Sequence, residues 1–180
     1  NILDLARLEA GTVKVKRELC TLDTVVRQVI KEVLPLAKRH GHTLVFSIPK
    51  MLPPIYMDKE MMHTIFTNLL SNAIKYTPEG GKIEVKIKEE GNTIHVMVKD
   101  TGIGIAEEDL EKIFQPFYVS DIHGTSLSQS KPEFERTGLG LAVTREYVKI
   151  HGGKIWAESR IGEGSIFHIL LPIHHDSLEN

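Results

Sequence analysis

The sequence predicts an α+β fold in the form of a two-layer α/β sandwich. Two observations predict this fold class. Apolar residues recur at helical spacing in three long segments, and they alternate with polar residues in short segments that pair around glycine-containing turns. Helices that gather around antiparallel hairpins pack against one sheet. At 180 residues, the chain suits one domain with a sizeable core.

The first half of the chain predicts two long helices with a strand between them. Residues 43–48 are the strand, and residues 49–54 are a connection. The first helix ends before Gly41, and its apolar residues are Leu22, Val25, Val26, Val29, Ile30 and Val33. Asp58 suits the N-cap of the second helix, whose apolar stripe is Met62, Ile65, Phe66, Leu69, Leu70 and Ala73.

The second half predicts two hairpins separated by a loop and a helix. The expected elements are strands at 82–88 and 93–99 around Gly91-Asn92, a short helix at 107–114, a long mobile loop at 118–136, a helix at 139–150, and strands at 154–158 and 165–171. A loop of that length in a compact domain is usually functional or disordered.

The composition fits a soluble globular protein, because 41% of the residues are hydrophobic and 26% are charged. A net charge of −2 gives no reason to expect nucleic acid as a partner. The single cysteine, Cys20, favours a reducing compartment, so we expect a cytoplasmic domain. The chain begins at Asn1 rather than Met, so we expect a piece of a longer protein. It has no apolar run of ~18 residues, which leaves open a membrane anchor elsewhere in that longer protein.

Four separated segments carry residue types that nucleotide chemistry uses. They are, in order, residues 68–76 (NLLSNAIKY), 100–104 (DTGIG), 114–117 (FQPF) and 137–142 (TGLGLA). Together they supply amides that can bind a metal ion, one carboxylate, and glycines that let backbone N–H groups approach phosphates. All four in this order are difficult to obtain by chance, and they predict one nucleotide pocket.

With these segments, the chain resembles the catalytic, ATP-binding domain of bacterial sensor histidine kinases. This family shares a superfamily with gyrase-type topoisomerases, large heat-shock chaperones and mismatch-repair ATPases. In the family the four segments are called the N, G1, F and G2 boxes. The likeness covers roughly residues 19–172. It implies a mixed, mostly antiparallel sheet that helices cover on one face, with a long mobile lid over the nucleotide.

The resemblance also implies how the chain is organised. Residues 1–18 are similar to the end of the family's dimerisation and phospho-acceptor helix hairpin with its linker, 19–173 are the ATP-binding catalytic domain, and 174–180 are a flexible tail. The family's acceptor histidine lies upstream, on the first hairpin helix, and an acidic residue follows it. His175-Asp176 has that dipeptide but lies in the tail. We therefore expect the acceptor outside this chain.

In the N box, Asn72 lies about 40° from Asn68 around a helix, and Lys75 lies about 20° to the other side. A solvated helix face is one reading, but asparagine is a poor helix former and two of them one turn apart favour a functional strip. An amide oxygen beside phosphates suits Mg²⁺, which takes few protein ligands. By the resemblance, Asn72 is the Mg²⁺ ligand, Asn68 and Lys75 serve the phosphate side, and Tyr76 lies against the nucleotide.

Asn68 separates two reaction classes. In the related ATPases, a glutamate one turn before the metal-binding asparagine activates the attacking water. Asn68 occupies that place here and cannot act as a general base. The sequence therefore favours phosphoryl transfer over hydrolysis.

In the G1 box, Asp100 is expected at the end of a strand. Local sequence alone fits a turn aspartate before a glycine equally well. By the resemblance, Asp100 accepts a hydrogen bond from the adenine amino group, and Gly102 and Gly104 let the backbone pass close to the base. Ile105 belongs to the same ATP-binding set.

In the G2 box, Gly138 and Gly140 precede a helix, so they can present backbone N–H groups and a positive helix end to phosphates. A Gly-X-Gly sequence is a weak signal by itself. The resemblance adds three further ATP-binding residues, which are Thr137, Leu139 and Leu141. Phe114 and Phe117 of the F box are expected to be core residues that anchor the base of the loop.

Two positions depart from the family pattern. The family has a basic residue directly after Phe-Tyr, where this chain has Val119, and a glycine before Thr-Gly-Leu-Gly, where this chain has Arg136. Arg136 adds a guanidinium group that can reach phosphate oxygens in place of the lost cation. The alternative is an exposed loop arginine. Lys131 is the next candidate.

The sequence thus predicts the catalytic domain of a sensor histidine kinase, which moves the γ-phosphoryl group of Mg-ATP to a histidine on a separate helical domain. By the resemblance, its partners are ATP or ADP, the dimerisation and phospho-acceptor helices of the same homodimeric protein, and a response regulator. Two rivals remain. One is a superfamily ATPase, against which Asn68 argues; the other is a degenerate regulatory domain without kinase activity, which Val119 and Arg136 keep open.

Overall fold

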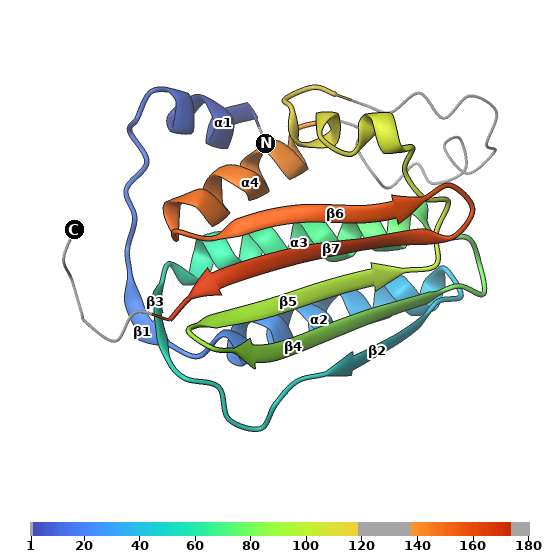
Figure 1. Ribbon diagram of the computed structural model, residues 1–180, viewed down its shortest axis with the longest axis horizontal. Helices are drawn as coiled ribbons and strands as arrows, with labels where there is room; N and C mark the ends of the chain where they lie inside the picture. The colour runs from blue at the N-terminus through green and yellow to red at the C-terminus, as the bar shows by residue number, and fades with distance from the viewer. Residues whose placement is uncertain (1, 119–137, 174–180) are drawn as a thin grey trace.

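The centre of the molecule is a five-stranded sheet with strand order β2-β4-β5-β7-β6, and the long helices lie against one of its faces (Figure 1). The computed structural model describes residues 2–118 and 138–173. The strands of this sheet are β2 (Thr43–Ser47), β4 (Lys82–Glu90), β5 (Thr93–Asp100), β6 (Lys154–Arg160) and β7 (Gly164–Pro172). β2 pairs with β4 in parallel, and the other pairs are antiparallel. The predicted two-layer sandwich with a mixed, mostly antiparallel sheet is confirmed.

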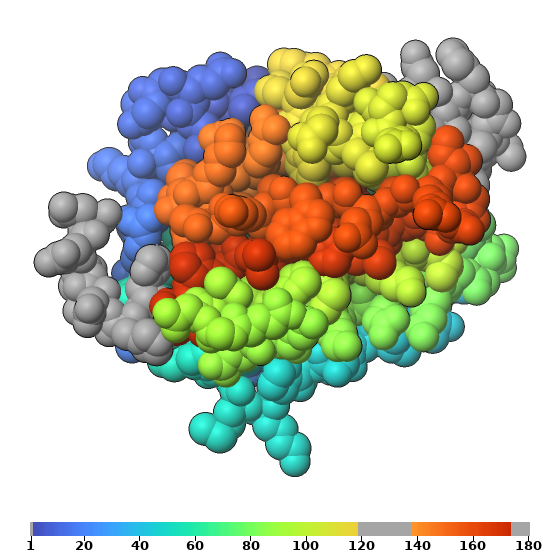
Figure 2. All heavy atoms as spheres, viewed as in Figure 1, coloured from blue at the N-terminus to red at the C-terminus, as the bar shows by residue number. Residues whose placement is uncertain are grey.

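The described helices are α1 (Ile2–Glu9), α2 (Leu22–Arg39), α3 (Lys59–Tyr76) and α4 (Gly140–Ile150). The predicted apolar stripes of α2 and α3 are buried. Asp58 caps α3 as predicted, because its side chain accepts a hydrogen bond from the N–H of Met61. The stripes of α2 and α3 pack with the inward residues of β4 and β5 into one core. Figure 2 shows the opposite face of the sheet, which no helix covers in that view.

The structure differs from the prediction in two places. β1 (Glu18–Cys20) and β3 (Ile55–Met57) form a second, two-stranded antiparallel sheet. Three-residue strands are too short to show an alternating pattern, and β3 directly follows the predicted connection. The short helix expected at 107–114 is two 3₁₀ helices, η1 (Glu107–Asp109) and η2 (Lys112–Phe114). Both are single turns, for which helical periodicity has no room.

The segment before β1 is tied to the rest of the fold by two hydrogen bonds. The backbone N–H of Lys16 donates to Asp58 Oδ2 at 2.9 Å, and Arg17 Nη2 donates to the carbonyl oxygen of Ile150 at 2.6 Å. The predicted boundary between residues 18 and 19 falls inside β1. The predicted lid, apart from Tyr118, and the tail at 174–180 lie outside the described residues. Among the described helices, none combines the length and apolar character that crossing a membrane requires.

Candidate functional site

The N box and the G2 box meet through one side chain. Asn68 Nδ2 donates to the carbonyl oxygen of Gly140 and to Thr144 Oγ1, at 3.1 Å each. Thr144 Oγ1 in turn donates to the Gly140 oxygen at 2.8 Å. The amide therefore holds the middle of α3 against the first turn of α4. Sequence reasoning missed Thr144, although its place four residues after Gly140 puts it on the same face of α4.

The other N-box residues lie on the same side of α3. Asn72, Lys75 and Tyr76 are half-buried, as Asn68 is. Within the described part of the chain, the Asn72 amide makes no hydrogen bond, so its oxygen is available to a ligand. Lys75 Nζ lies 5.1 Å from the centroid of the Tyr76 ring. The four predicted residues therefore lie on one side of α3. The Asn68 amide already donates two hydrogen bonds within the protein, whereas the Asn72 amide makes none in the described part of the chain.

The end of the N box contacts the G1 box. The backbone N–H of Ile103 donates to the Tyr76 carbonyl oxygen at 3.1 Å. Gly102 lies so close that a β-carbon there would be 2.6 Å from the same oxygen. A side chain at Gly102 would therefore push the G1 box away from α3.

Asp100 is the buried carboxylate of the site. It is the last residue of β5, as predicted, and only 6% of its surface is exposed. Its Oδ1 accepts the backbone N–H of Gly102 at 2.9 Å. Burial raises the pKa of Asp100 from 3.8 to about 6, against the opposing effect of hydrogen bonds from Gly102 and Ser165. The group stays ionised at neutral pH and can accept a hydrogen bond from a ligand.

Gly104 and Ile105 fix the G1 turn to the β6–β7 hairpin. Gly104 has φ of 79°, and a β-carbon there would lie 2.0 Å from the carbonyl oxygen of Arg160. The Ile105 N–H donates to Ser159 Oγ at 2.7 Å. Ser159 also contacts Ser165 Oγ at 2.7 Å. No sequence signal identified Ser159, because its role depends on the register between β6 and β7.

The F box contacts the G2 box through Phe117 and Gly138, the latter being the first described residue of the G2 box. The N–H of Phe117 donates to the Gly138 carbonyl oxygen at 2.9 Å. Gly138 has φ of 67°, and a β-carbon there would lie 2.8 Å from Phe117 backbone atoms. Figure 1 shows this segment beside the start of α4.

The two F-box phenylalanines differ. Phe114 is 4% exposed and packs edge-on against Phe167, with ring centroids 6.3 Å apart, so it is a core residue as predicted. Phe117 is 65% exposed with φ of 64°, so its assignment to the core was wrong. Its positive φ turns the side chain outward, which spacing cannot reveal.

The two leucines of the G2 box differ in how deeply they are buried. Leu139 is fully buried and Leu141 is half-buried. Thr137, Arg136, Lys131 and Val119 lie outside the described residues. The structure thus brings the N, G1, F and G2 boxes together and leaves the departures from the family pattern untested.

The residues present fit a Mg²⁺ ion that a nucleotide brings with it. In residues 2–118 and 138–173, no group of three or more His, Cys, Asp or Glu side chains could hold a metal ion. Asn72 can offer one neutral oxygen, and Mg²⁺ commonly takes one or two protein ligands beside phosphates and waters. The donor set therefore suits a phosphate-bound Mg²⁺ rather than an all-protein site.

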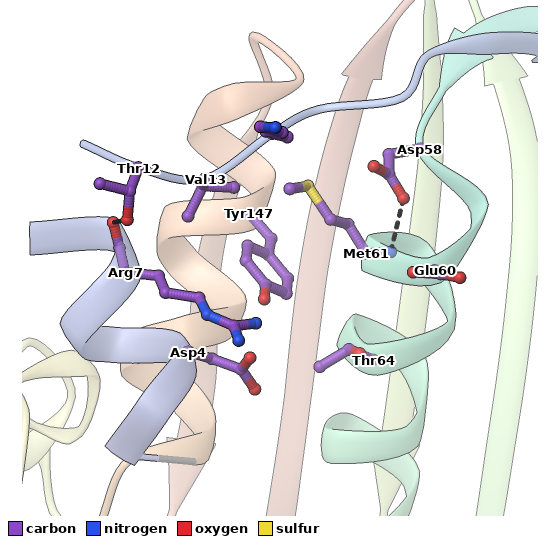
Figure 3. Close-up of a pocket in the computed structure, with 10 residues that line it drawn as sticks. Asp4, Arg7, Thr12, Val13, Asp58, Glu60, Met61, Thr64 and Tyr147 are labelled. Carbon is purple, nitrogen blue, oxygen red and sulfur yellow. Dashed lines mark hydrogen bonds between the residues drawn. The ribbon is translucent and has the colours of Figure 1, made fainter. Parts of the chain in front are cut away.

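A separate cavity of about 400 Å³ lies near the other end of α3. Figure 3 shows Asp4 and Arg7 of α1 facing Tyr147 of α4 and Thr64 of α3 across it. Both carboxylate oxygens of Asp58, at its rim, already accept backbone hydrogen bonds. None of the predicted nucleotide residues lines this cavity.

The sequence matches one family and many relatives. The family model for histidine kinase-, DNA gyrase B- and HSP90-like ATPases matches residues 57–175. The non-motile and phage-resistance protein of Caulobacter vibrioides is 36% identical in an alignment of 179 residues, which covers 97% of this chain and 20% of that protein. The adaptive-response sensory kinase SasA of Synechococcus sp. (strain JA-3-3Ab) is 37% identical over 175 residues, which are 97% of this chain and 44% of that protein. The chain spans less than half the length of each.

Solved structures agree with the sequence matches. The catalytic domain of histidine kinase ThkA has a TM-score of 0.72 and 28% identity, covering 87% of this chain and 95% of that one. Full-length ShkA in complex with AMPPNP has a TM-score of 0.82 and 25% identity, covering 98% of this chain and 35% of that one. The chain therefore belongs to the family of histidine kinase-, DNA gyrase B- and HSP90-like ATPases, and it is homologous to the catalytic domains of sensor histidine kinases.

Proposed function

We propose that this domain binds Mg-ATP and transfers the γ-phosphoryl group to a histidine on a separate helical domain, as a step of two-component signal transduction. One observation supports transfer over hydrolysis. Asn68 stands where the related ATPases are expected to hold a water-activating glutamate, and its amide donates to Gly140 and Thr144. An amide cannot accept a proton from water, and none of residues 68–76 is acidic. A superfamily ATPase is therefore the weaker reading.

The proposed contacts divide the pocket into a base end and a phosphate end. Asp100 accepts a hydrogen bond from the adenine amino group, and the close backbone packing at Gly102 and Gly104 shapes the base end. Asn72 offers its amide oxygen to Mg²⁺, and Asn68 and Lys75 face the phosphates. The G2 turn before α4 offers backbone N–H groups to the phosphates.

The protein's part in the reaction is positioning and charge stabilisation. Phosphoryl transfer needs little covalent help from the enzyme, since the acceptor imidazole is itself the nucleophile. When bound, Mg²⁺ neutralises phosphate charge. Asn68 contributes by fixing the N box against the G2 turn, so both ends of the phosphate site keep one geometry.

The proposed partners are parts of a longer homodimeric protein and one downstream protein. Residues 1–18 are the end of the dimerisation and phospho-acceptor hairpin with its linker, residues 19–173 are the catalytic domain, and the acceptor histidine lies upstream. A response regulator then receives the phosphoryl group; ThkA, which shares the fold, has been solved in complex with response regulator protein TrrA. The proposed location of the domain is the cytoplasm, which is compatible with a membrane anchor elsewhere in the longer protein.

Nucleotide titrations and a hydrolysis assay on this chain test the proposal. We expect ATP to bind at least tenfold more tightly than GTP, and ATP affinity to fall when EDTA removes Mg²⁺. Inorganic phosphate release should stay near the blank. Equal affinity for ATP and GTP would overturn the adenine assignment, and steady turnover would favour the ATPase reading. If the longer protein bound ATP but transferred no phosphoryl group, the result would favour the alternative of a degenerate regulatory domain.

A further inference from the structure

Arg145 of α4 is a half-buried cation whose Nε–H finds no hydrogen-bond acceptor in the described part of the chain. Its Nε atom is buried and makes no hydrogen bond. Lys149, one turn later on the same helix, is exposed and lies 3.5 Å from Glu146. A buried donor without an acceptor costs free energy, so such a guanidinium group is stabilised when an anion reaches it.

The guanidinium group of Arg145 lies among the nucleotide boxes. Its Cζ atom is 6.0 Å from the centroid of the Phe114 ring in the F box. Phe114 is held in the core by Phe167, so the ring is a fixed platform for a cation–π contact. The preceding residue, Thr144, accepts a hydrogen bond from Asn68 in the N box.

The helix also directs Arg145 toward the phosphate end. Side chains of an α-helix lean toward its N-terminus, so Arg145 covers the turn that contains Leu141. That turn begins at Gly140, directly after the glycine turn at Gly138. The positive end of the helix and the guanidinium group are therefore on the same side of the site.

We propose that Arg145 binds the phosphate chain of the nucleotide. The inference rests on the nucleotide-binding function proposed above and adds a residue that the four boxes do not contain. The planar guanidinium group can donate two parallel hydrogen bonds to phosphate oxygens, and Phe114 holds its plane in place. The ligand class is a nucleoside di- or triphosphate, because the contact is with phosphate and not with the base. Arg145 supplies this charge from a regular helix, independently of Arg136.

The test compares a phosphorylated ligand with an unphosphorylated one. ATP affinity is measured by calorimetry, and adenosine affinity by NMR titration, for wild type, Arg145→Met, Arg145→Lys and Lys149→Met. Arg145→Met should weaken ATP binding at least tenfold and change adenosine binding less than twofold. Arg145→Lys should weaken ATP binding by a smaller factor, since it keeps the charge and loses the fork. Lys149→Met is the matched control and should change neither affinity.

Two results would overturn the role of Arg145. Unchanged ATP affinity in Arg145→Met would show that the guanidinium group does not reach phosphate. An equal loss for ATP and adenosine in both Arg145 variants would show that the residue only supports the fold. A wild-type chain that binds neither ligand would instead refute the proposed function itself, so the two failures are distinguishable.

Discussion

Asn68 and Gly140 are joined by a 3.1 Å hydrogen bond across 72 positions of sequence, from the side-chain amide of α3 to the first residue of α4. A β-carbon at Gly140 would lie 3.6 Å from Asn68 Cγ, so the two residues are in direct contact. The relationship ties the segment that bears the amides to the segment that begins the phosphate-facing helix. Several measurable consequences depend on it.

Asn68→Ala should reduce the free energy of unfolding by about 1–3 kcal/mol, because the Gly140 oxygen and Thr144 Oγ1 lose a donor. Urea denaturation measures the change. Thr144→Val removes one acceptor from the same network. The double variant should be less destabilised than the sum of the single variants, by about 0.5 kcal/mol or more. Strict additivity would show that the contact is energetically unimportant.

Asp100→Asn should stabilise the unliganded protein near neutral pH. Burial raises the folded-state pKa of Asp100 to about 6, above the unfolded value of 3.8, so the folded chain binds this proton more tightly. Wild-type stability attributable to Asp100 therefore falls as pH rises from about 4 to about 6. The advantage of Asp100→Asn should be present above about pH 6 and disappear below about pH 4. An advantage that does not change with pH would contradict this account.

The same carboxylate should make nucleotide binding depend on pH. The ionised carboxylate is the acceptor for the adenine amino group in the proposed pose, so ATP affinity should fall as pH drops through about 6. Asp100→Asn should lower ATP affinity at neutral pH, and should reduce the preference for ATP over GTP. Calorimetry at several pH values tests both. An Asp100→Asn variant with wild-type affinity and selectivity would remove Asp100 from the site.

Gly104→Ala should be far more destabilising than Gly80→Ala. Both glycines have positive φ, 79° and 84°, but a β-carbon would meet the Arg160 oxygen at 2.0 Å at Gly104 and nothing within 4 Å at Gly80. Gly80→Ala should cost about 1–2 kcal/mol from backbone strain alone. Gly104→Ala should cost more, and should weaken ATP binding because the G1 turn moves from β6. An equal loss of thermal stability in the two variants would show that the backbone at Arg160 can move away from residue 104 at little cost.

Periodicity predicted most of the fold because the long elements each bury one face. The stripes of α2 and α3 are buried as predicted, and the Asp58 cap begins α3 at the expected residue. The failures are short elements. β1 and β3 have three residues each and pair with one another, so their existence depends on a contact between distant segments.

The site was predicted less completely than the fold. Motif order placed Asn68, Asp100 and the glycines in one region, which the contacts among the boxes support. It did not identify Ser159 or the outward turn of Phe117, because strand register and a positive φ set these. Nor did it identify Arg145, whose position follows from a contact with the F box. Roles for Arg136 and Thr137 stay predictions, since both lie outside the described residues.

Phosphohistidine formation tests the central claim most directly. The longer protein that carries the acceptor helices is incubated with γ-labelled ATP and Mg²⁺, and the label is followed after acid and after alkali. The account predicts label that is lost in acid and kept in alkali, as for a phosphorylated histidine, and no label on this chain alone. The rate at which the acceptor histidine is labelled should fall in Asn72→Ala, because this variant loses the proposed Mg²⁺ ligand. Phosphate release to water without labelled protein, at the same rate with and without the acceptor helices, would contradict the account.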